Sequence, residues 1–511
     1  MSSTLNSSWV STDPSWSLYY PFSTTAVAVG LVTIIGLILV SPTVFSKKKN
    51  GIKELGGLSI LTARPFFSKR FDFLWSNFQK TADTMFKFKV LQHSIVAVRG
   101  EEARKVFLDN KNLNFTEGYK LLMGAAPDLK DISVEGYEQD NVTLLNKRIG
   151  TLLNRRRLSD VIPTLLDDVN IRMKSWGNEG KFDPFRNIYD LVFQMTVRMA
   201  SCDELAKNPE AIRNLQKHYW DLEKSSTATA LLLPWFPGSA KKQQARATKG
   251  LYTIISDYVE KRRSADVPSS DAVDILLAQG LDNADIVGFI LAIIFAGVIN
   301  TGIISCWALV YLSCHPEWKV KIKAEVETMI SKHIDTSTSE PLHKLLGAIP
   351  ISVWEDEMPM IEVVIRETIR MVSGGALLRR NVLEDLTIDG KTISKGDFMA
   401  YQTYDVHMNP DIYSDPSRFD PDRYSSGREE DKKETFAYLG WGAGRHPCTG
   451  MKVAKLEIKL ILALFLAGYD YEVVDKSGNP AKTLPRSDYN DIHAARPIGE
   501  PCFIQFKRVV E

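Results

Sequence analysis

The chain has 511 residues, of which 44% are hydrophobic and 24% are charged, and this composition excludes a disordered protein. The 63 Lys and Arg residues against 62 Asp and Glu residues give a formal net charge of +1. This balance argues against a nucleic-acid partner bound through a global positive field. Five cysteines are too few for a disulfide scaffold, and their odd number indicates reduced thiols.

An uncharged apolar segment near the N-terminus, residues 24–46, predicts a transmembrane anchor, with a buried core helix as the alternative. About twenty apolar residues in a helix cross the hydrocarbon core of a bilayer. Asp13 is the only charged residue before this segment, and Lys47–Lys49 follow it, which is the reverse of a cleaved signal peptide. The positive-inside rule therefore predicts a single-pass protein of the endoplasmic reticulum membrane, with residues 1–23 as a lumenal tail and residues 47–511 in the cytosol.

The lumenal tail carries a glycosylation sequon at Asn6. Residues 55–510 contain no low-complexity linker and no repeat, and helical periodicity dominates them. The fold class predicted is mainly α with small β-sheets, a single large catalytic domain behind the anchor. The clearest helical periodicities and strand signals are, in chain order, Phe86–Val98, Val161–Val169, Leu191–Met199, Leu386–Phe398 and Cys502–Val509.

A second apolar stretch, Ile286–Leu312, is also long enough to span a membrane. We interpret it as a long buried helix, because Asn300 and Thr301 lie near its middle and helical character continues through residues 315–317 into the charged segment Lys319–Ile330. Polar groups at the centre of such a helix commonly mark a functional site.

A glycine-rich loop precedes a helical run, Met451–Leu466, and contains the fourth cysteine. The loop reads Trp441-Gly442-Ala443-Gly444-Arg445-His446-Pro447-Cys448-Thr449-Gly450. We expect the three glycines to permit a tight turn that a side chain would obstruct. Such a turn places the sulfur of Cys448 beside a helix N-terminus, where unpaired N–H groups and the helix dipole stabilise a thiolate.

A thiolate in a reduced protein is a metal ligand or a nucleophile. A zinc site would need several more Cys or His residues at short spacing, and the loop has none. A hydrolytic nucleophile would need a dedicated base, and His446 is the nearest candidate in the sequence. A lone cysteine suits axial ligation of haem iron, because the porphyrin supplies the other four ligands.

This loop resembles the haem-binding signature of the cytochrome P450 superfamily. The resemblance implies that Cys448 is the axial thiolate of haem b, that Trp441 replaces the usual Phe, and that His446 occupies the basic position. The remaining signature positions are the glycines Gly442, Gly444 and Gly450. The implied enzyme is a cytochrome P450 monooxygenase of the microsomal, fungal type.

Two further motifs of the family precede this loop in the chain, in the expected order. Glu367 and Arg370 are spaced to share one helix face, and Arg423 lies in a segment similar to the family's aromatic–Pro–acid–Arg–aromatic meander. The resemblance implies that these three residues form a buried ionic triad. Arg380 resembles the arginine that binds a haem propionate together with His446, and Arg379 is the alternative.

The central helix departs from the family pattern. Ile299 stands where the family has an acid, and Asn300 stands where it has a threonine. Such a helix resembles the branch that contains sterol 7-hydroxylases, sterol 12-hydroxylases and prostacyclin synthase. Asn300 and Thr301 are therefore the catalytic candidates, and Asn300 can orient bound oxygen or a water because an amide both donates and accepts hydrogen bonds.

The substrate and the redox partner are predicted from two surfaces. The resemblance implies that residues 293–301 and 373–378 line the substrate pocket. Neither stretch carries a charge, which favours a small apolar substrate such as a terpenoid, a sterol or a related secondary metabolite. Lys452, Lys455 and Lys459 share one helix face after Cys448, and the resemblance implies that this face docks an NADPH-dependent flavoprotein reductase. A solvated lysine face without a partner is the alternative.

Three hypotheses of function remain open. The first is a monooxygenase that uses NADPH electrons through the reductase. The second is a haem-thiolate isomerase or dehydratase that rearranges a peroxide substrate without external electrons. The third is a non-catalytic haem-dependent binding protein, which is disfavoured because a pure binder has no need of a strongly electron-donating ligand.

Overall fold

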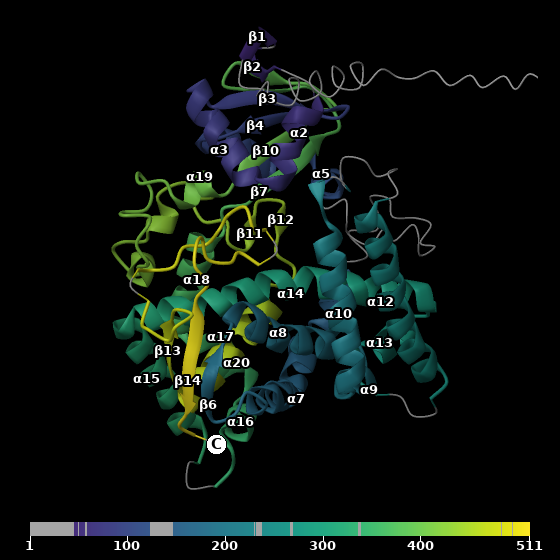
Figure 1. The fold of residues 1–511 in the computed structure, drawn as a ribbon, viewed down its shortest axis with the longest axis vertical. Helices are drawn as coiled ribbons and strands as arrows, with labels where there is room; N and C mark the ends of the chain where they lie inside the picture. Colours follow the sequence, from purple (N-terminus) through teal and green to yellow (C-terminus); the bar gives the residue numbers. More distant parts are fainter. Residues whose placement is uncertain are drawn as a thin grey trace, which may run out of the picture.

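The computed structural model describes residues 45–49, 51–56, 59–122, 147–228, 230, 238–265, 269–335, 339–481, 483–492 and 494–510. The expected anchor, residues 24–46, lies outside this range apart from its last two residues, which belong to strand β1 (Phe45–Lys49). Asn6 also lies outside it. The predicted fold class, mainly helical with small sheets, is confirmed by the elements described below (Figure 1).

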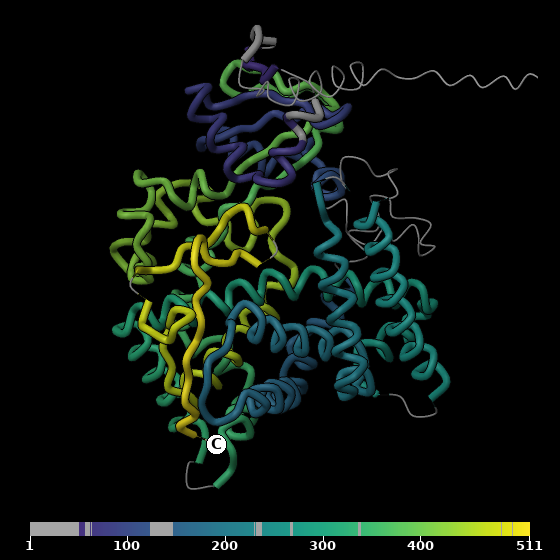
Figure 2. Tube along the Cα trace, in the orientation of Figure 1, coloured from purple at the N-terminus to yellow at the C-terminus, as the bar shows by residue number. Residues whose placement is uncertain are grey.

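A seven-stranded sheet lies at one end of the molecule, in the order β1-β2-β3-β4-β10-β7-β5 (Figure 1). Its strands come from two distant parts of the chain, as the adjoining purple and green segments of Figure 2 show. Strand β10 pairs parallel to β4, with Phe398 opposite Ile95, and antiparallel to β7, with Met399 opposite Arg379. The strands are β1, β2 (Ile52–Leu55), β3 (Met85–Val90), β4 (His93–Val98), β5 (Leu113–Asn114), β7 (Ala376–Asn381) and β10 (Phe398–Gln402).

Two smaller sheets account for the remaining strand predictions. Strands β8 (Leu386–Ile388) and β9 (Lys391–Ile393) form a hairpin whose two turn residues, Asp389 and Gly390, both have positive φ, as the favoured type I′ turn requires. The C-terminal strand signal corresponds to β14 (Phe503–Arg508). It lies between β13 (Tyr469–Val474) and β6 (Glu179–Phe182).

Helices make up most of the rest of the described chain. They are α2 (Ser59–Ser68), α3 (Arg70–Thr81), α4 (Glu101–Asp109), α5 (Phe115–Leu122), α7 (Arg155–Lys174), α8 (Pro184–Ala200), α9 (Asp203–Lys207), α10 (Pro209–Ser225), α12 (Ser239–Arg263), α13 (Ala272–Ala278), α14 (Asn283–Cys314), α15 (Pro316–His333), α16 (Leu342–Gly347), α17 (Ile351–Asp356), α18 (Pro359–Val372), α19 (Tyr404–His407) and α20 (Met451–Gly468). Two 3₁₀ turns, η2 (Pro421–Tyr424) and η3 (Glu430–Lys432), lie between α19 and the glycine-rich loop.

Helix α14 is the second apolar stretch of the sequence and runs through the middle of the molecule (Figure 1). Asp282 caps its N-terminus by accepting a hydrogen bond from the Asp285 amide at 2.7 Å. Among the described helices it alone is long and apolar enough to cross a membrane, but most of that segment is buried inside the protein, as predicted. The expected helical continuation is wrong at one point. The chain breaks at His315, because a residue before proline is driven out of the helical region, and Pro316 starts α15.

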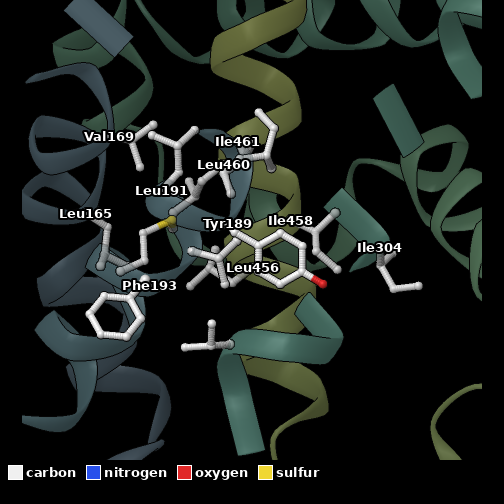
Figure 3. Close-up of a cluster of buried hydrophobic side chains, with 14 of the residues drawn as sticks. Leu165, Val169, Tyr189, Leu191, Phe193, Ile304, Leu456, Ile458, Leu460 and Ile461 are labelled. Atoms are coloured by element: carbon white, nitrogen blue, oxygen red, sulfur yellow. The ribbon is translucent and has the colours of Figure 1, made fainter. Parts of the chain in front are cut away.

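The main core contains side chains of α7, α8, α14 and α20. Figure 3 shows side chains from all four helices converging, with Tyr189 of α8 at the centre, Ile304 of α14 on one side and Leu165 of α7 on the other. Gly302 allows this approach, since a Cβ there would lie 2.7 Å from the ring of Tyr189. The core therefore fixes α20, and with it the loop that precedes α20.

Candidate active site

The glycine-rich loop is a short hairpin that ends at the start of α20. Strand β11 (Gly442–Ala443) pairs antiparallel to β12 (His446–Pro447). The amide of Cys448 donates to the Trp441 carbonyl at 2.7 Å, which closes the hairpin. Because α20 begins at Met451, the sulfur of Cys448 lies beside a helix N-terminus.

Two of the loop glycines are sterically required. Gly442 has φ +69° and Gly444 has φ +61°, a region that favours glycine. A Cβ would also lie 2.5 Å from the His446 carbonyl oxygen at position 442, and 2.4 Å from the Leu108 carbonyl oxygen at position 444. The steric expectation is wrong for Gly450. A Cβ at Gly450 would meet no atom of the described residues within 4 Å.

Cys448 differs from the other four cysteines, all of which the structure describes, because it alone is exposed. Although the residue is exposed at its surface, the surrounding protein partly desolvates the sulfur and so raises the pKa of the Cys448 thiol, and a hydrogen bond from the Gly450 amide acts in the opposite direction. The expected lowering of the Cys448 pKa by the helix N-terminus is therefore smaller than the raising by desolvation. A metal ion bound to the sulfur would reverse this balance, since a coordinating thiol is deprotonated.

The donor set fits haem better than a protein-only metal site. Within the described residues no three His, Cys, Asp or Glu side chains group closely enough to hold a metal ion. A single exposed thiol in a loop whose close packing excludes a Cβ at Gly442 and Gly444 suits a planar cofactor that brings its own four ligands.

The two arginines of β7 lie on opposite faces of the strand, because successive strand residues alternate. Arg379 is buried and donates to the Leu108 carbonyl at 3.1 Å, and the Arg445 amide donates to the same oxygen at 3.2 Å. Burial, then the positive charges of Arg379 and Arg445, lower the pKa of His446. Arg380 instead forms an ion pair with Glu117 of α5 at 3.2 Å.

Among the described residues, the positive charges that act on His446 are those of Arg379 and Arg445 rather than that of Arg380. The haem-carboxylate role of Arg380 stays a prediction, with Arg379 as its alternative. His446 also stacks on Phe115 of α5, with 5.2 Å between ring centroids. The indole of Trp441 lies under the Lys455 ammonium, 5.6 Å from its centroid, and its N–H has no hydrogen-bond partner among the described residues.

The three residues of the expected ionic triad lie together and are fully buried. Glu367 accepts from Arg370 Nε and Nη2, both at 2.8 Å, and from Arg423 Nε at 2.9 Å. The Asp420 amide and the Tyr424 hydroxyl donate to the same carboxylate, at 3.0 and 3.1 Å. The group holds a fourth member, Glu430, which pairs with Arg423 at 2.6 Å.

Two formal negative charges thus balance two positive ones inside the protein, and the charges of Glu367 raise the pKa of Arg370 against the effect of burial. Sequence reasoning missed Glu430, because a Glu in a polar segment carries no signal of burial. It also missed His407, which contacts both Arg370 and Leu439, two residues before the glycine-rich loop.

The two catalytic candidates on α14 lie in different environments. Asn300 is exposed, as is Ala296 one turn earlier, although most of this helix is buried. Thr301 is only 3% exposed. It lies one turn from Gly297, whose Cβ would meet Thr196 of α8 at 3.1 Å. The structure therefore presents Asn300 on an exposed face of α14 and buries Thr301, and the catalytic roles of both residues stay predictions.

The three lysines of α20 do not form one free face. Lys452 is exposed, but Lys455 forms an ion pair with Glu362 of α18. Lys459 is 3% exposed and donates to the Trp354 carbonyl at 2.8 Å, and burial lowers its pKa. Lys459 cannot contact a partner protein, which corrects the prediction for this residue.

Comparisons with known proteins identify the family. The family described as cytochrome P450 matches residues 58–487. The cytochrome P450 monooxygenase AacuE of Aspergillus aculeatus is 32% identical over 449 residues, which are 86% of this chain and 89% of that protein. The cytochrome P450 monooxygenase nsrP of Aspergillus novofumigatus is 29% identical over 419 residues, 80% of each chain.

A solved structure agrees with this assignment at the level of the fold. The retinoic acid bound cyanobacterial CYP120A1 has a TM-score of 0.69 and 19% sequence identity, and the match covers 87% of this chain and 96% of that one. The family and the fold imply haem b with a cysteine thiolate as the axial ligand. The chain belongs to the cytochrome P450 superfamily and is a P450 monooxygenase.

Proposed function

We propose that Cys448 supplies the axial thiolate of the haem in an enzyme that inserts one oxygen atom from O₂ into an apolar substrate. The observation that carries this assignment is the exposed Cys448 thiol, in a loop where Gly442 and Gly444 are sterically required, at the start of α20. Thiolate-bound haem supplies the activation of dioxygen, which no side chain can perform. In this proposal Arg379 and His446 bind the haem carboxylates, with Trp441, Gly442 and Gly450 against the ring.

Asn300 is the residue of α14 that we place beside bound oxygen. Its amide both donates and accepts hydrogen bonds, so it can hold a water that delivers a proton. Its exposure, together with that of Ala296 one turn earlier, on a mostly buried helix supports this role. Thr301 then has a supporting role through helix packing.

The proposed substrate is a terpenoid, a sterol or a related secondary metabolite, because neither of the two predicted pocket stretches, residues 293–301 and residues 373–378, carries a charge. The electrons come from NADPH through a flavoprotein reductase. Lys452 and Arg445 are both exposed, on either side of Cys448 in the sequence, and are suited to contact an acidic partner.

Replacement of Cys448 tests the ligand. Cys448→Ser should abolish the red-shifted absorption of the reduced carbon-monoxide complex, because that band requires a thiolate opposite carbon monoxide. Cys314→Ser, at a partly buried cysteine outside the loop, is the matched control and should keep the band. A Cys448→Ser protein that keeps the band would show that another residue is the ligand.

Replacement of Asn300 tests the reaction class. Asn300→Ala should lower product formation by about 10²–10⁴-fold, the range of proton-transfer catalysis. It should divert NADPH electrons to hydrogen peroxide, with haem content unchanged. The competing isomerase hypothesis predicts product from a peroxide substrate without NADPH or reductase, and full turnover under those conditions would refute the monooxygenase proposal.

We also infer that residues 24–46 anchor the enzyme in the endoplasmic reticulum membrane, with the catalytic domain in the cytosol. Strand β1 begins at Phe45, so a deletion should stop at Val44 to leave the sheet intact. The truncated protein should leave the membrane fraction and keep its haem. Alkali-resistant membrane integration of the truncated protein would contradict this topology.

A further inference from the structure

The imidazole of His407 is completely buried between the end of α18 and the glycine-rich loop. Its Nε2 lies 3.0 Å from the amide nitrogen of Leu439, and its Nδ1 lies 3.3 Å from the carbonyl oxygen of Ser373. Ser373 is the residue that ends α18, and Leu439 lies two residues before Trp441. A single side chain therefore joins the helix of Glu367 and Arg370 to the base of the loop.

The backbone partners fix one protonation state of this ring. The Leu439 amide can only donate, so Nε2 must accept, and Nδ1 then carries the proton that it donates to the Ser373 carbonyl. A doubly protonated imidazole would lose the bond to Leu439. Burial and the charge of Arg370 lower the pKa of His407 to about 3, which keeps the ring neutral.

The hydrogen bonds around His407 form a continuous path from the ionic group to the cysteine. Arg370 Nη1 donates to the His407 carbonyl at 2.7 Å. Beyond the ring, the Leu439 carbonyl accepts from the Gly442 amide at 3.1 Å, and the Trp441 carbonyl accepts from the Cys448 amide at 2.7 Å. Three hydrogen bonds in succession, at the amides of Leu439, Gly442 and Cys448, thus connect His407 to the backbone of the cysteine.

Gly440 makes the approach of the loop to α18 possible. A Cβ at this position would lie 2.5 Å from Ile369 Cγ2, on the helix of Arg370. The segment before the loop therefore packs closely against α18, next to the Leu439 amide that His407 accepts. On its other side the Arg445 amide is fixed to the Leu108 carbonyl at 3.2 Å. His407 and Leu108 are the two anchors of the hairpin that carries Cys448.

We propose that His407 is a positioning residue for the axial cysteine, which acts by accepting the Leu439 amide and so fixes the hairpin that presents Cys448. This inference rests on the proposed role of Cys448. It differs from a general packing role, because it requires one acceptor atom at the position of Nε2 and a ring of the same volume does not replace it. The side chain touches neither the iron nor the substrate.

Three substitutions of His407 distinguish the effect of the hydrogen-bond acceptor at Nε2 from the effect of the ring volume. His407→Phe keeps the ring volume and removes both nitrogens, which leaves the buried Leu439 amide without a partner. His407→Gln places an amide oxygen near the position of Nε2. His407→Asn can reach the Ser373 side but not Leu439, and it replaces the Phe variant if that protein does not fold. His343→Phe, at a buried histidine of α16, is the control.

The first measurement is hydrogen exchange at the Leu439 amide. Exchange in His407→Phe should be about tenfold faster or more, because a lost hydrogen bond to a buried donor favours local opening to that extent. His407→Gln should restore most of the protection, and His343→Phe should match the unmodified protein. Unchanged exchange in His407→Phe, or equal exchange in the Phe and Gln variants, would overturn the proposal.

The second measurement is the fraction of the reduced carbon-monoxide complex that shows the red-shifted thiolate band. This fraction should fall in His407→Phe and recover in His407→Gln, and a full band in both would overturn the link to Cys448. The two proposals fail in different ways. If Cys448→Ser keeps the band, the ligand assignment fails, whereas exchange at Leu439 still reports on His407.

Discussion

Glu457 of α20 is a buried carboxylic acid, and its replacement should change how stability depends on pH. The side chain is 2% exposed, and its Oε1 has no hydrogen-bond partner among the described residues. Burial raises the pKa of Glu457 from 4.5 to about 8, so the folded protein holds it protonated at neutral pH. Glu457→Gln replaces this acid with a neutral amide of the same shape.

The sign follows from proton binding in the two states. Between pH 4.5 and about 8 the folded protein keeps this proton while the unfolded chain releases it. The stability that protonated Glu457 contributes is therefore fully present below pH 4.5 and is lost as the pH rises to about 8. Above that pH, Glu457 adds no further pH dependence to the free energy of unfolding. The loss between pH 5 and pH 8 amounts to about 3 kcal/mol, because each pKa unit corresponds to about 1.4 kcal/mol.

The assay is urea unfolding from pH 5 to pH 9, followed by tryptophan fluorescence, on both proteins at each pH. The variant should gain about 3 kcal/mol of unfolding free energy over the unmodified protein as the pH rises from 5 to 8. Glu472→Gln, at an exposed position of β13, is the control for the same change of side chain. A Glu457→Gln difference that stays constant within about 0.5 kcal/mol would refute the reasoning.

Two further predictions concern the charged groups of the site. Glu367→Gln leaves a net positive charge buried and should cost about 3–5 kcal/mol in a urea melt, whereas Glu117→Gln, at a partly exposed ion pair, should cost about 0–1 kcal/mol. Equal shifts of the two unfolding midpoints would contradict a structural role for Glu367. Arg379→Gln should weaken haem retention, measured as the rate of haem transfer to apomyoglobin, more than Arg380→Gln does, and the reverse order would restore Arg380 as the haem contact.

The parts of the site that depend on spacing along the chain were predictable from the sequence. The i, i+3 spacing of Glu367 and Arg370 and the glycine loop before a helix are local patterns, and the structure shows both. The choice between Arg379 and Arg380 depends on which face of β7 meets α4, which is a tertiary contact. The burial of Lys459 depends on α17, whose Trp354 carbonyl it binds, and helix periodicity alone cannot reveal such a neighbour.

The role of His407 had no signal in the sequence for the same reason. It lies in a short helix, α19, and both partners of its ring are backbone groups, which leave no pattern in residue identity. The sequence likewise contains no pattern that predicts the burial of the Glu430 carboxylate. Charge balance inside the protein is set by the fold of the segment from η2 to η3, and residue type at one position does not indicate it.

The pairing of β4 with β10 has a consequence for synthesis of the protein on the ribosome. Ile95 and its partner Phe398 are separated by about 300 residues, so the sheet cannot close until most of the chain has been made. At about 5–20 residues per second this interval lasts roughly 15–60 s. During that time β4 is an open edge with unpaired backbone groups, which is a template for aggregation. Nascent chains that stop before Phe398 should therefore depend on chaperones to remain soluble.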